Sequence, residues 1–237
     1  MIKAVFFDLD GTLYDFFGAT QTALQSVSRE LELNVPRLEG AFWRGYYSLM
    51  EGPRGRSLDP QTALPELIAS ALRESGASPR SPSPGTCRAL ARRWMELFLG
   101  AIRPFEGVLE LLTGLRAGGI EIGVISNGAR DFQKLKLEAL GLMACFTDGS
   151  LFCSGDFSSG KPDPEIFRAA LESFSRTAEE ALFVGDSPVT DVPGAVKAGL
   201  RVIWLNRYGL SRPPGCGGVL QARCFSEVAE MIRDLGG

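Results

Sequence analysis

The sequence contains no histidine in its 237 residues, and this absence excludes several catalytic mechanisms. A Ser-His-Asp triad, a phosphohistidine intermediate and a zinc ion bound by imidazole are all ruled out. Acid–base chemistry near neutral pH must therefore use carboxyl groups, lysine, tyrosine or cysteine.

Cysteine is also scarce, and its five positions form no recognisable framework. An odd number of cysteines without a C-x-x-C pair argues against a disulfide scaffold or a zinc ribbon. Unpaired thiols are typical of a reducing compartment. The apolar run at the N-terminus is too short for a signal peptide and soon reaches the acidic Asp8. We therefore expect a cytoplasmic location.

Long apolar stretches and clustered basic residues are absent as well. No segment of the sequence approaches the length of a membrane span. The net charge is −3, without the basic stripe that is typical of nucleic-acid binding. With 45% hydrophobic and 22% charged residues, the composition is that of a globular protein. We expect no nucleic-acid or membrane partner, and either a monomer or a homodimer.

Short apolar runs alternate with helical patterns at the start of the chain and again after Pro104. Strands are expected at residues 3–7, 120–125, 181–184 and 201–205, and a short apolar segment lies at 151–153. Helices are expected between and after them, at residues 106–117, 130–140, 164–174, 190–198 and 226–235. This alternation predicts an α/β fold, a doubly wound parallel sheet of the Rossmann-like type with helices on both faces.

The block between the first strand and Pro104 has a different pattern, without a convincing strand. Helices are expected at residues 15–33, 37–50, 60–74 and 86–99, with loops at 52–56 and 77–85. The sequence therefore predicts a core domain formed by residues 1–14 and 102–237. Residues 15–101 would form an inserted, all-helical domain.

Polar residues cluster where the predicted strands end. They follow three strands in chain order: Asp8, Asp10 and Thr12; Ser126 and Asn127; Asp186 and Asp191. Lys161 stands in a loop before the helix at 164–174. Taken alone, each of these sets of polar residues is also common in turns and at helix caps. In open α/β sheets, however, ligands bind at the carboxyl ends of the strands, where these residues would meet.

Several carboxylates at one edge of a sheet raise each other's pKa unless a cation balances them. A set of oxygen ligands without His or Cys suits Mg²⁺. The metal and Lys161 would neutralise the oxygens of a phosphoryl group, and the Ser126 hydroxyl would help to orient them. The residues therefore predict a Mg²⁺ site that binds a phosphoryl group.

The order of these motifs resembles the haloacid dehalogenase superfamily of hydrolases. The matching segments are DLDGT from Asp8, Ser126 after the second strand, Lys161 in GKPDPEIF, and GDSPVTD around Asp186. The resemblance covers nearly the whole chain. It implies a Rossmann-like core with a helical cap inserted after the first motif, and a phosphatase that hydrolyses a small phosphate monoester.

The resemblance also implies a role for each residue of the motifs. Asp8 would be the nucleophile that forms an aspartyl-phosphate, and Asp10 the general acid and base. Ser126 and Lys161 would hold the phosphoryl oxygens. The metal would be bound by the side chains of Asp8 and Asp186, by the carbonyl of Asp10 and, through water, by Asp191. Thr12 and Asn127 would add orienting hydrogen bonds.

Other activities of similar proteins leave alternatives. Dehalogenases share the second motif but lack a carboxylate two residues after the nucleophile, whereas Asp10 is present here. Phosphomutases of this cap type generally use a cap histidine and phosphonate hydrolases a cap lysine, and residues 13–102 contain neither. A non-catalytic binding module on the same fold would be indicated by loss of Asp8 or Asp10, and both are present.

The substrate is left open among sugar phosphates, nucleotides and phosphoglycolate-like acids. Tyr14, Phe16 and Phe17 follow the first motif and could either line its mouth or pack in a core. We hypothesise that Arg54 and Arg56, in a glycine-rich loop of the helical insert, contact an anionic part of the substrate.

Overall fold

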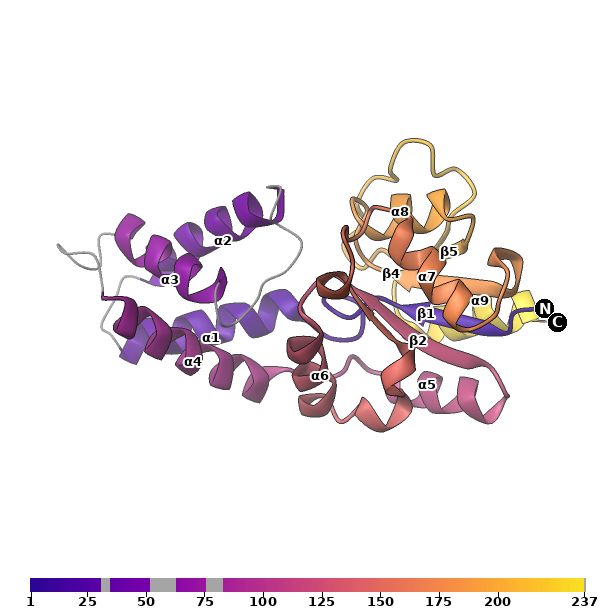
Figure 1. Ribbon diagram of the computed structural model, residues 1–237, viewed down its shortest axis with the longest axis horizontal. Helices are drawn as coiled ribbons and strands as arrows, with labels where there is room; N and C mark the ends of the chain where they lie inside the picture. Colours follow the sequence, from indigo (N-terminus) through magenta and orange to yellow (C-terminus); the bar gives the residue numbers. More distant parts are fainter. Residues whose placement is uncertain (31–34, 52–62, 76–82, 237) are drawn as a thin grey trace. The chain divides into compact units, whose positions relative to one another are not determined.

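The computed structural model describes residues 1–30, 35–51, 63–75 and 83–236. It divides into two compact units, which are treated separately (Figure 1). The first, the core unit, comprises Met1–Asp15 and Arg103–Gly237. The second, the helical unit, comprises Phe16–Ile102.

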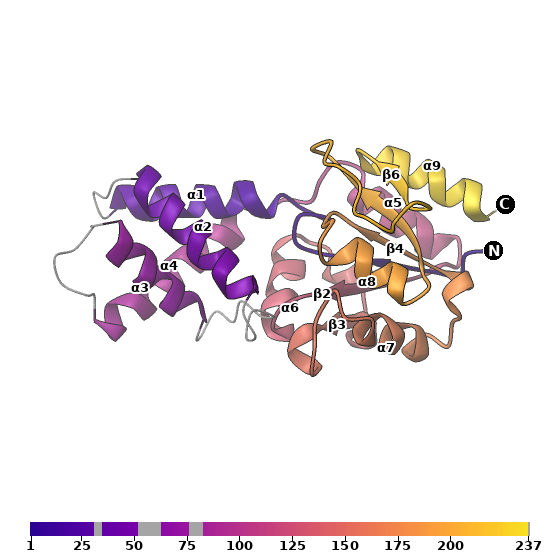
Figure 2. The same cartoon turned by 90° about the horizontal axis from the view of Figure 1, so that it is seen from above.

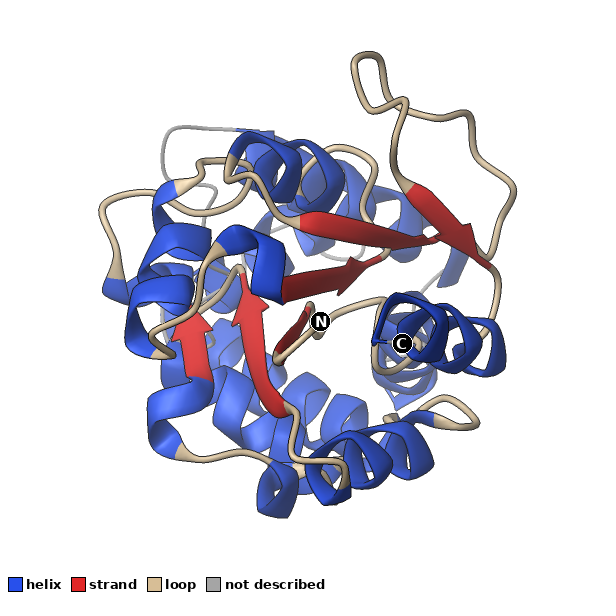
Figure 3. Cartoon of the chain, turned by 90° about the vertical axis from the view of Figure 1, so that its right-hand side faces the viewer, coloured by secondary structure: helices blue, strands red, loops and turns tan. Residues whose placement is uncertain are grey.

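The core unit is built on a six-stranded parallel sheet with the strand order β3-β2-β1-β4-β5-β6 (Figure 3). The strands are β1 Ala4–Phe7, β2 Glu121–Ser126, β3 Leu151–Cys153, β4 Ala181–Gly185, β5 Arg201–Leu205 and β6 Leu220–Ala222. Because β1 pairs with both β2 and β4, the residue after it enters the middle of the carboxyl edge.

Helices cover both faces of this sheet. They are α5 Val108–Ala117, α6 Arg130–Ala139, α7 Glu165–Ser173, α8 Asp191–Lys197 and α9 Phe225–Gly236. Short 3₁₀ segments lie at Met143–Cys145, Asp148–Ser150, Ser154–Asp156 and Ala178–Glu180. Helices α5 and α9 lie on one side of the sheet, and α7 and α8 lie on the other (Figure 2).

Strand β1 is buried on both faces, which explains its uninterrupted apolar sequence. Ala4 and Phe6 belong to the hydrophobic cluster that includes residues of α7 and α8. Val5 and Phe7, which alternate with them, are also fully buried. The α/β class and the doubly wound parallel sheet expected from the sequence are thus confirmed.

The sequence pattern predicted neither β3, where it showed only a short apolar segment, nor β6. Strand β6 has three residues, and the side chains of Leu220 and Gln221 are exposed. An edge strand of this length has no apolar run and no alternation to mark it, so its pairing with β5 is decided by tertiary structure.

The described part of the helical unit consists of helices joined by segments outside the described residues. The helices are α1 Phe16–Glu30, α2 Val35–Glu51, α3 Ala63–Glu74 and α4 Pro84–Ala101. Aromatic rings pack between them: Trp94 stacks on Phe98 at 4.9 Å and on Phe42 at 5.9 Å between ring centroids. The large apolar contact area of such rings stabilises the packing of the helices.

Helix α4 begins earlier than the sequence pattern predicted. We expected Pro84 and Gly85 in a loop, but Ser83 caps the helix by accepting a hydrogen bond from the Thr86 N–H at 3.1 Å. Proline is tolerated in the first turn because its missing N–H has no partner there in any case. The expected loops at 52–56, with Arg54 and Arg56, and at 77–82 lie outside the described residues.

Membrane insertion is not indicated by any described helix. Throughout the described ranges, every helix is too short or too polar to cross a bilayer.

Candidate active site

Asp8 follows β1 directly and is almost completely buried at the carboxyl edge of the sheet. Its N–H donates to the carbonyl of Val184 at 2.9 Å, which continues the pairing between β1 and β4 for one residue. The chain then turns at Gly11, where φ is +88° and a Cβ would lie 2.5 Å from Asp186 Oδ2. Glycine is needed at this position for both reasons.

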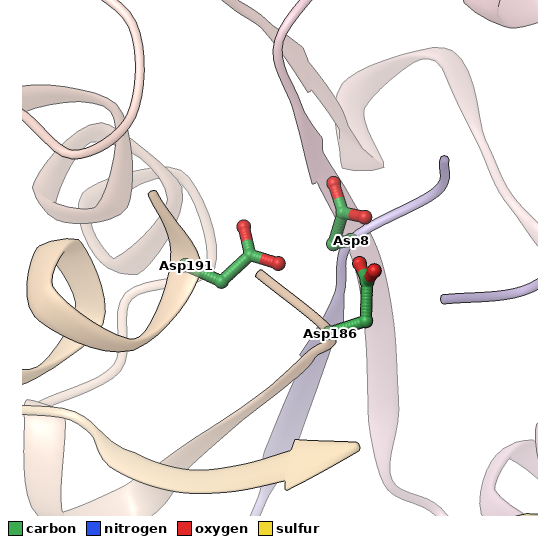
Figure 4. Close-up of side chains that lie close together, drawn as sticks. All are labelled: Asp8, Asp186 and Asp191. Carbon is green, nitrogen blue, oxygen red and sulfur yellow. The ribbon is translucent and has the colours of Figure 1, made fainter. Parts of the chain in front are cut away.

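Three carboxylates meet at this edge. Asp186 follows β4, and Asp191 is the first residue of α8. One carboxylate oxygen each of Asp8, Asp186 and Asp191 lie within 4.8 Å of one another (Figure 4). The N–H of Ser187 donates to Asp191 Oδ2 at 3.0 Å and fixes that side chain in the loop between β4 and α8.

Lys161 brings a buried positive charge to this cluster. Its ammonium donates to Asp8 Oδ1, lies 2.7 Å from Asp191 Oδ1 and donates to the carbonyl of Ile125 at 2.9 Å. The backbone of Lys161 is held by Asn127, whose Oδ1 accepts from its N–H at 2.8 Å and whose Nδ2 donates to its carbonyl at 2.9 Å. Asn127 therefore orients Lys161 through the main chain.

The charges in this cluster shift the pKa values of its members. Burial raises the pKa of Asp8 to about 7, the Lys161 ammonium opposes this rise, and the Asp191 carboxylate adds to it. Burial, followed by the charges of Asp191 and Asp8, raises the pKa of Asp186 well above its usual value. For Lys161, burial acts to lower the pKa, but Asp191 and Asp8 outweigh it and raise the pKa.

The donor set fits a hard divalent cation. Three carboxylates face one ammonium, so ionisation of all three would leave an excess of negative charge in a buried place. The described cluster offers oxygen atoms alone, which suits Mg²⁺ better than a transition metal. A cation bound among these oxygens would offset the burial cost that raises the pKa values of Asp8 and Asp186.

Thr12 links the first motif to the last. Its Oγ1 donates to Asp186 Oδ1 and accepts from the Asp186 N–H, both at 3.0 Å. The Trp204 indole N–H donates to the carbonyl of Asp186 at 2.9 Å. Asp186 is thus held through its side chain, its N–H and its carbonyl.

Asp10 lies in different surroundings. Its carboxylate is contacted through both oxygens by the ammonium of Lys136, at 2.8 and 2.7 Å, and it accepts a hydrogen bond from the Tyr14 hydroxyl. Its side chain is not part of the three-carboxylate cluster. The predicted role of Asp10 at the metal concerned its main-chain carbonyl, and that role stays a prediction.

Ser126 ends β2 and is buried. Its hydroxyl accepts a hydrogen bond from Gln133 Nε2 at 2.9 Å, and the same amide donates to the Asn127 carbonyl at 3.0 Å. Gln133 Nε2 also lies 3.5 Å from Asp10 Oδ2. One amide group therefore contacts both the second motif and Asp10.

The core unit brings the predicted site residues together in one network of contacts. They are Asp8, Asp10, Thr12, Ser126, Asn127, Lys161, Asp186 and Asp191. The sequence reasoning missed Gln133 and Lys136 on α6 and the hydroxyl role of Tyr14. The sequence pattern gave no signal for them, because Gln133 and Lys136 are polar residues that the structure buries on the same face of α6 as Phe132 and Leu137.

The comparison with known families gives one description for most of the chain. A family model described as haloacid dehalogenase-like hydrolase matches residues 2–199. A phosphoglycolate phosphatase from Rhodospirillum rubrum is 36% identical over 220 residues, which cover 90% of this chain and 83% of that protein. A phosphoserine phosphatase from Thermus thermophilus is 36% identical over 144 residues, which cover 60% of this chain and 53% of that protein.

Solved structures agree on the fold. A hydrolase of the same family from Bacillus subtilis, described as bound to magnesium, has a TM-score of 0.78 at 21% identity and covers 98% of each chain. A 2-haloacid dehalogenase from Pseudomonas syringae has a TM-score of 0.71 at 28% identity and covers 99% of each chain.

Proposed function

The chain belongs to the haloacid dehalogenase-like hydrolases, and from that premise we propose that it is a magnesium-dependent phosphatase of small phosphate monoesters. The placement of Asp10 carries the proposal. Its carboxyl group lies outside the acidic cluster and is oriented by Lys136 and Tyr14, and a carboxyl group of this kind can act in its protonated form as the acid for an ester oxygen and in its ionised form as the base for water. The names of the phosphoglycolate and phosphoserine phosphatase relatives support the same reaction.

The proposed reaction has two steps, each served by a different carboxylate. In the first, which begins with Asp10 protonated, an Asp8 oxygen attacks phosphorus, the bond to the ester oxygen breaks, and Asp10 gives that oxygen its proton. In the second, Asp10 takes a proton from water as the water oxygen attacks phosphorus. The bond to Asp8 then breaks, inorganic phosphate leaves, and Asp8 is regenerated.

The remaining residues bind and orient the phosphoryl group in this proposal. Lys161 and Ser126 contact its oxygens, and Asn127 and Thr12 hold Lys161 and Asp186 in place. The metal would be held by the side chains of Asp8 and Asp186, by the Asp10 carbonyl and, through water, by Asp191. When bound, Mg²⁺ neutralises charge on the phosphoryl oxygens.

Dehalogenation is the second candidate, because the Pseudomonas syringae dehalogenase matches over the full length. A halide leaves carbon without needing a proton, so Asp10 would have no task in that reaction. The presence of a carboxyl group at Asp10, two residues after Asp8, therefore favours a leaving group that must be protonated.

A screen of the purified protein tests the proposal. The panel contains hydroxy-acid phosphates, sugar phosphates and nucleotides with Mg²⁺, and a parallel assay measures halide release from 2-chloro acids. We expect phosphate release from at least one monoester and no halide release. Halide release without phosphatase activity would establish the second candidate, and inactivity in both assays would favour a binding module.

A further inference from the structure

Lys136 is a buried lysine to which the reaction outlined above assigns no task. It lies on α6, its side chain is 3% exposed, and its ammonium sits 4.3 Å from the centroid of the Phe132 ring. Removing an ammonium group from water costs several kcal/mol unless a close partner compensates. Both oxygens of Asp10 supply such a partner at 2.8 and 2.7 Å.

The contact fixes the direction of the Asp10 carboxyl group. A carboxylate held through one oxygen can still rotate about its last bond, whereas contacts to both oxygens restrict that rotation. The Tyr14 hydroxyl adds a third contact, to Oδ1, and Tyr14 is fully buried. Asp10 therefore has a defined orientation, although its own side chain is 23% exposed.

Gln133 joins this group to the second motif. It lies one helical turn before Lys136, and its Nε2 contacts Ser126 Oγ at 2.9 Å and Asp10 Oδ2 at 3.5 Å. Gly128 leaves the space for this amide, since a Cβ there would lie 2.4 Å from Gln133 Nε2. Helix α6 thus sets the position of Asp10 relative to Ser126, which we assigned to the phosphoryl group.

We propose that Lys136 is a positioning residue that orients the carboxyl group of Asp10 for both proton transfers, with Gln133 tying that orientation to Ser126. The proposal rests on the proposed phosphatase function. Proton transfer needs hydrogen-bond distance between the carboxyl group and the ester oxygen or water. A displacement of about 1 Å in such a geometry can cost about 100-fold in rate.

The first experiment replaces Lys136 by Met or Gln and compares two substrates. For an alkyl phosphate, kcat should fall by about 100-fold, because both steps need Asp10. For p-nitrophenyl phosphate, the first step needs no acid, so the first turnover should stay fast while later turnovers slow. A burst of p-nitrophenol and accumulation of phosphorylated enzyme are the expected signature, whereas a general loss of structure would slow both steps and give no burst.

Matched variants separate this role from stability. Lys134→Met removes a neighbouring lysine of α6 whose partner is Asp148, at 3.0 Å, and it should leave both substrates within about twofold of wild type. Tyr14→Phe removes one contact to Asp10 without removing a buried charge, and it should give a smaller loss with the same burst. It therefore tests the orientation of Asp10 even if the Lys136 variants unfold, which melting curves will show.

A double-mutant cycle decides whether Lys136 acts through Asp10. In the Asp10→Asn background, Lys136→Met should reduce kcat by less than about threefold, because the group that it positions is already lost. Full additivity of the two losses, or Lys136 variants with wild-type kinetics, would overturn the proposal. A wild-type protein without phosphatase activity would instead refute the proposed function on which it rests.

Discussion

Asp8 and Asp10 stand two residues apart on one loop, yet the structure places them in opposite electrostatic surroundings. Asp8 lies with Asp186 and Asp191 around a single lysine, so negative charge is in excess. Asp10 faces Lys136 one to one, with the Tyr14 hydroxyl as a further donor. The negative charge of the first group needs a bound cation to balance it, whereas Lys136 already balances the negative charge of Asp10.

This difference suggests how one loop can serve two kinds of chemistry. An excess of buried carboxylates creates a site for a metal ion and for the phosphoryl group that the metal neutralises. The side chain of a carboxylate with its own lysine stays outside that site, and the lysine orients it toward the leaving group and water. Variants of each group should therefore differ in metal dependence and in leaving-group dependence.

The largest effect is expected at Asp8. Asp8→Asn should reduce phosphatase turnover by at least about 10⁴-fold, because an amide is a poor nucleophile and a poor metal ligand. Steady-state kinetics with the best substrate of the panel measures the loss. A variant that keeps activity within tenfold of wild type would contradict the nucleophile assignment.

The second-largest effect is expected on removal of the metal. Chelation by EDTA should lower turnover by about 10³-fold, and added Mg²⁺ should restore it, since several kcal/mol of charge stabilisation is lost. Full activity after exhaustive chelation would contradict the metal proposal.

Mg²⁺ binding can also be measured without turnover, as a rise in melting temperature. This rise should disappear in Asp186→Asn, which loses a ligand, and persist in Asp10→Asn, whose main-chain carbonyl is intact. If both variants lose the rise equally, the two groups are not electrostatically separate.

Asp10→Asn should have a smaller effect that depends on the leaving group. For an alkyl phosphate we expect a loss of about 10²- to 10³-fold, the usual contribution of a general acid or base. For p-nitrophenyl phosphate the loss should be confined to hydrolysis of the phosphorylated enzyme. Equal losses in the first turnover of both substrates would argue against the acid role.

Much of the fold, and much of the cluster formed by Asp8, Asp186 and Asp191, could be predicted from the sequence. Parallel strands buried on both faces appear as short apolar runs, and the polar residues that follow them converge at one edge. The placement of Asp8 and Asp186 follows from this geometry. The Asp8–Lys161 contact does not, because Lys161 belongs to a loop whose path is set by tertiary packing.

The contacts that surround Asp10 could not be predicted from the sequence in the same way. On α6 the apolar Leu135 is 41% exposed, whereas the charged Lys136 is buried. A pattern that places apolar residues inside and charged residues outside therefore assigns these two neighbours to the wrong sides. What reverses them is the partner that Asp10 offers to Lys136, a contact between residues 126 positions apart in the chain.

The smallest expected effect concerns Asn127, and it sharpens the contrast between the two carboxylates. Asn127→Ala removes both hydrogen bonds to the backbone of Lys161, at 2.8 and 2.9 Å, so the ammonium beside Asp8 loses part of its support. Turnover should fall by about tenfold, in the range found when a supporting group behind a site residue is lost.

Because Asp10 keeps its contacts with Lys136 and Tyr14, the alkyl and p-nitrophenyl substrates should be affected alike. The kcat ratio of the two substrates measures this directly, with Asp10→Asn as the contrasting variant. A ratio that shifts as it does in Asp10→Asn would mean that the two groups are coupled through the Gln133 amide, which contacts both the Asn127 carbonyl and Asp10.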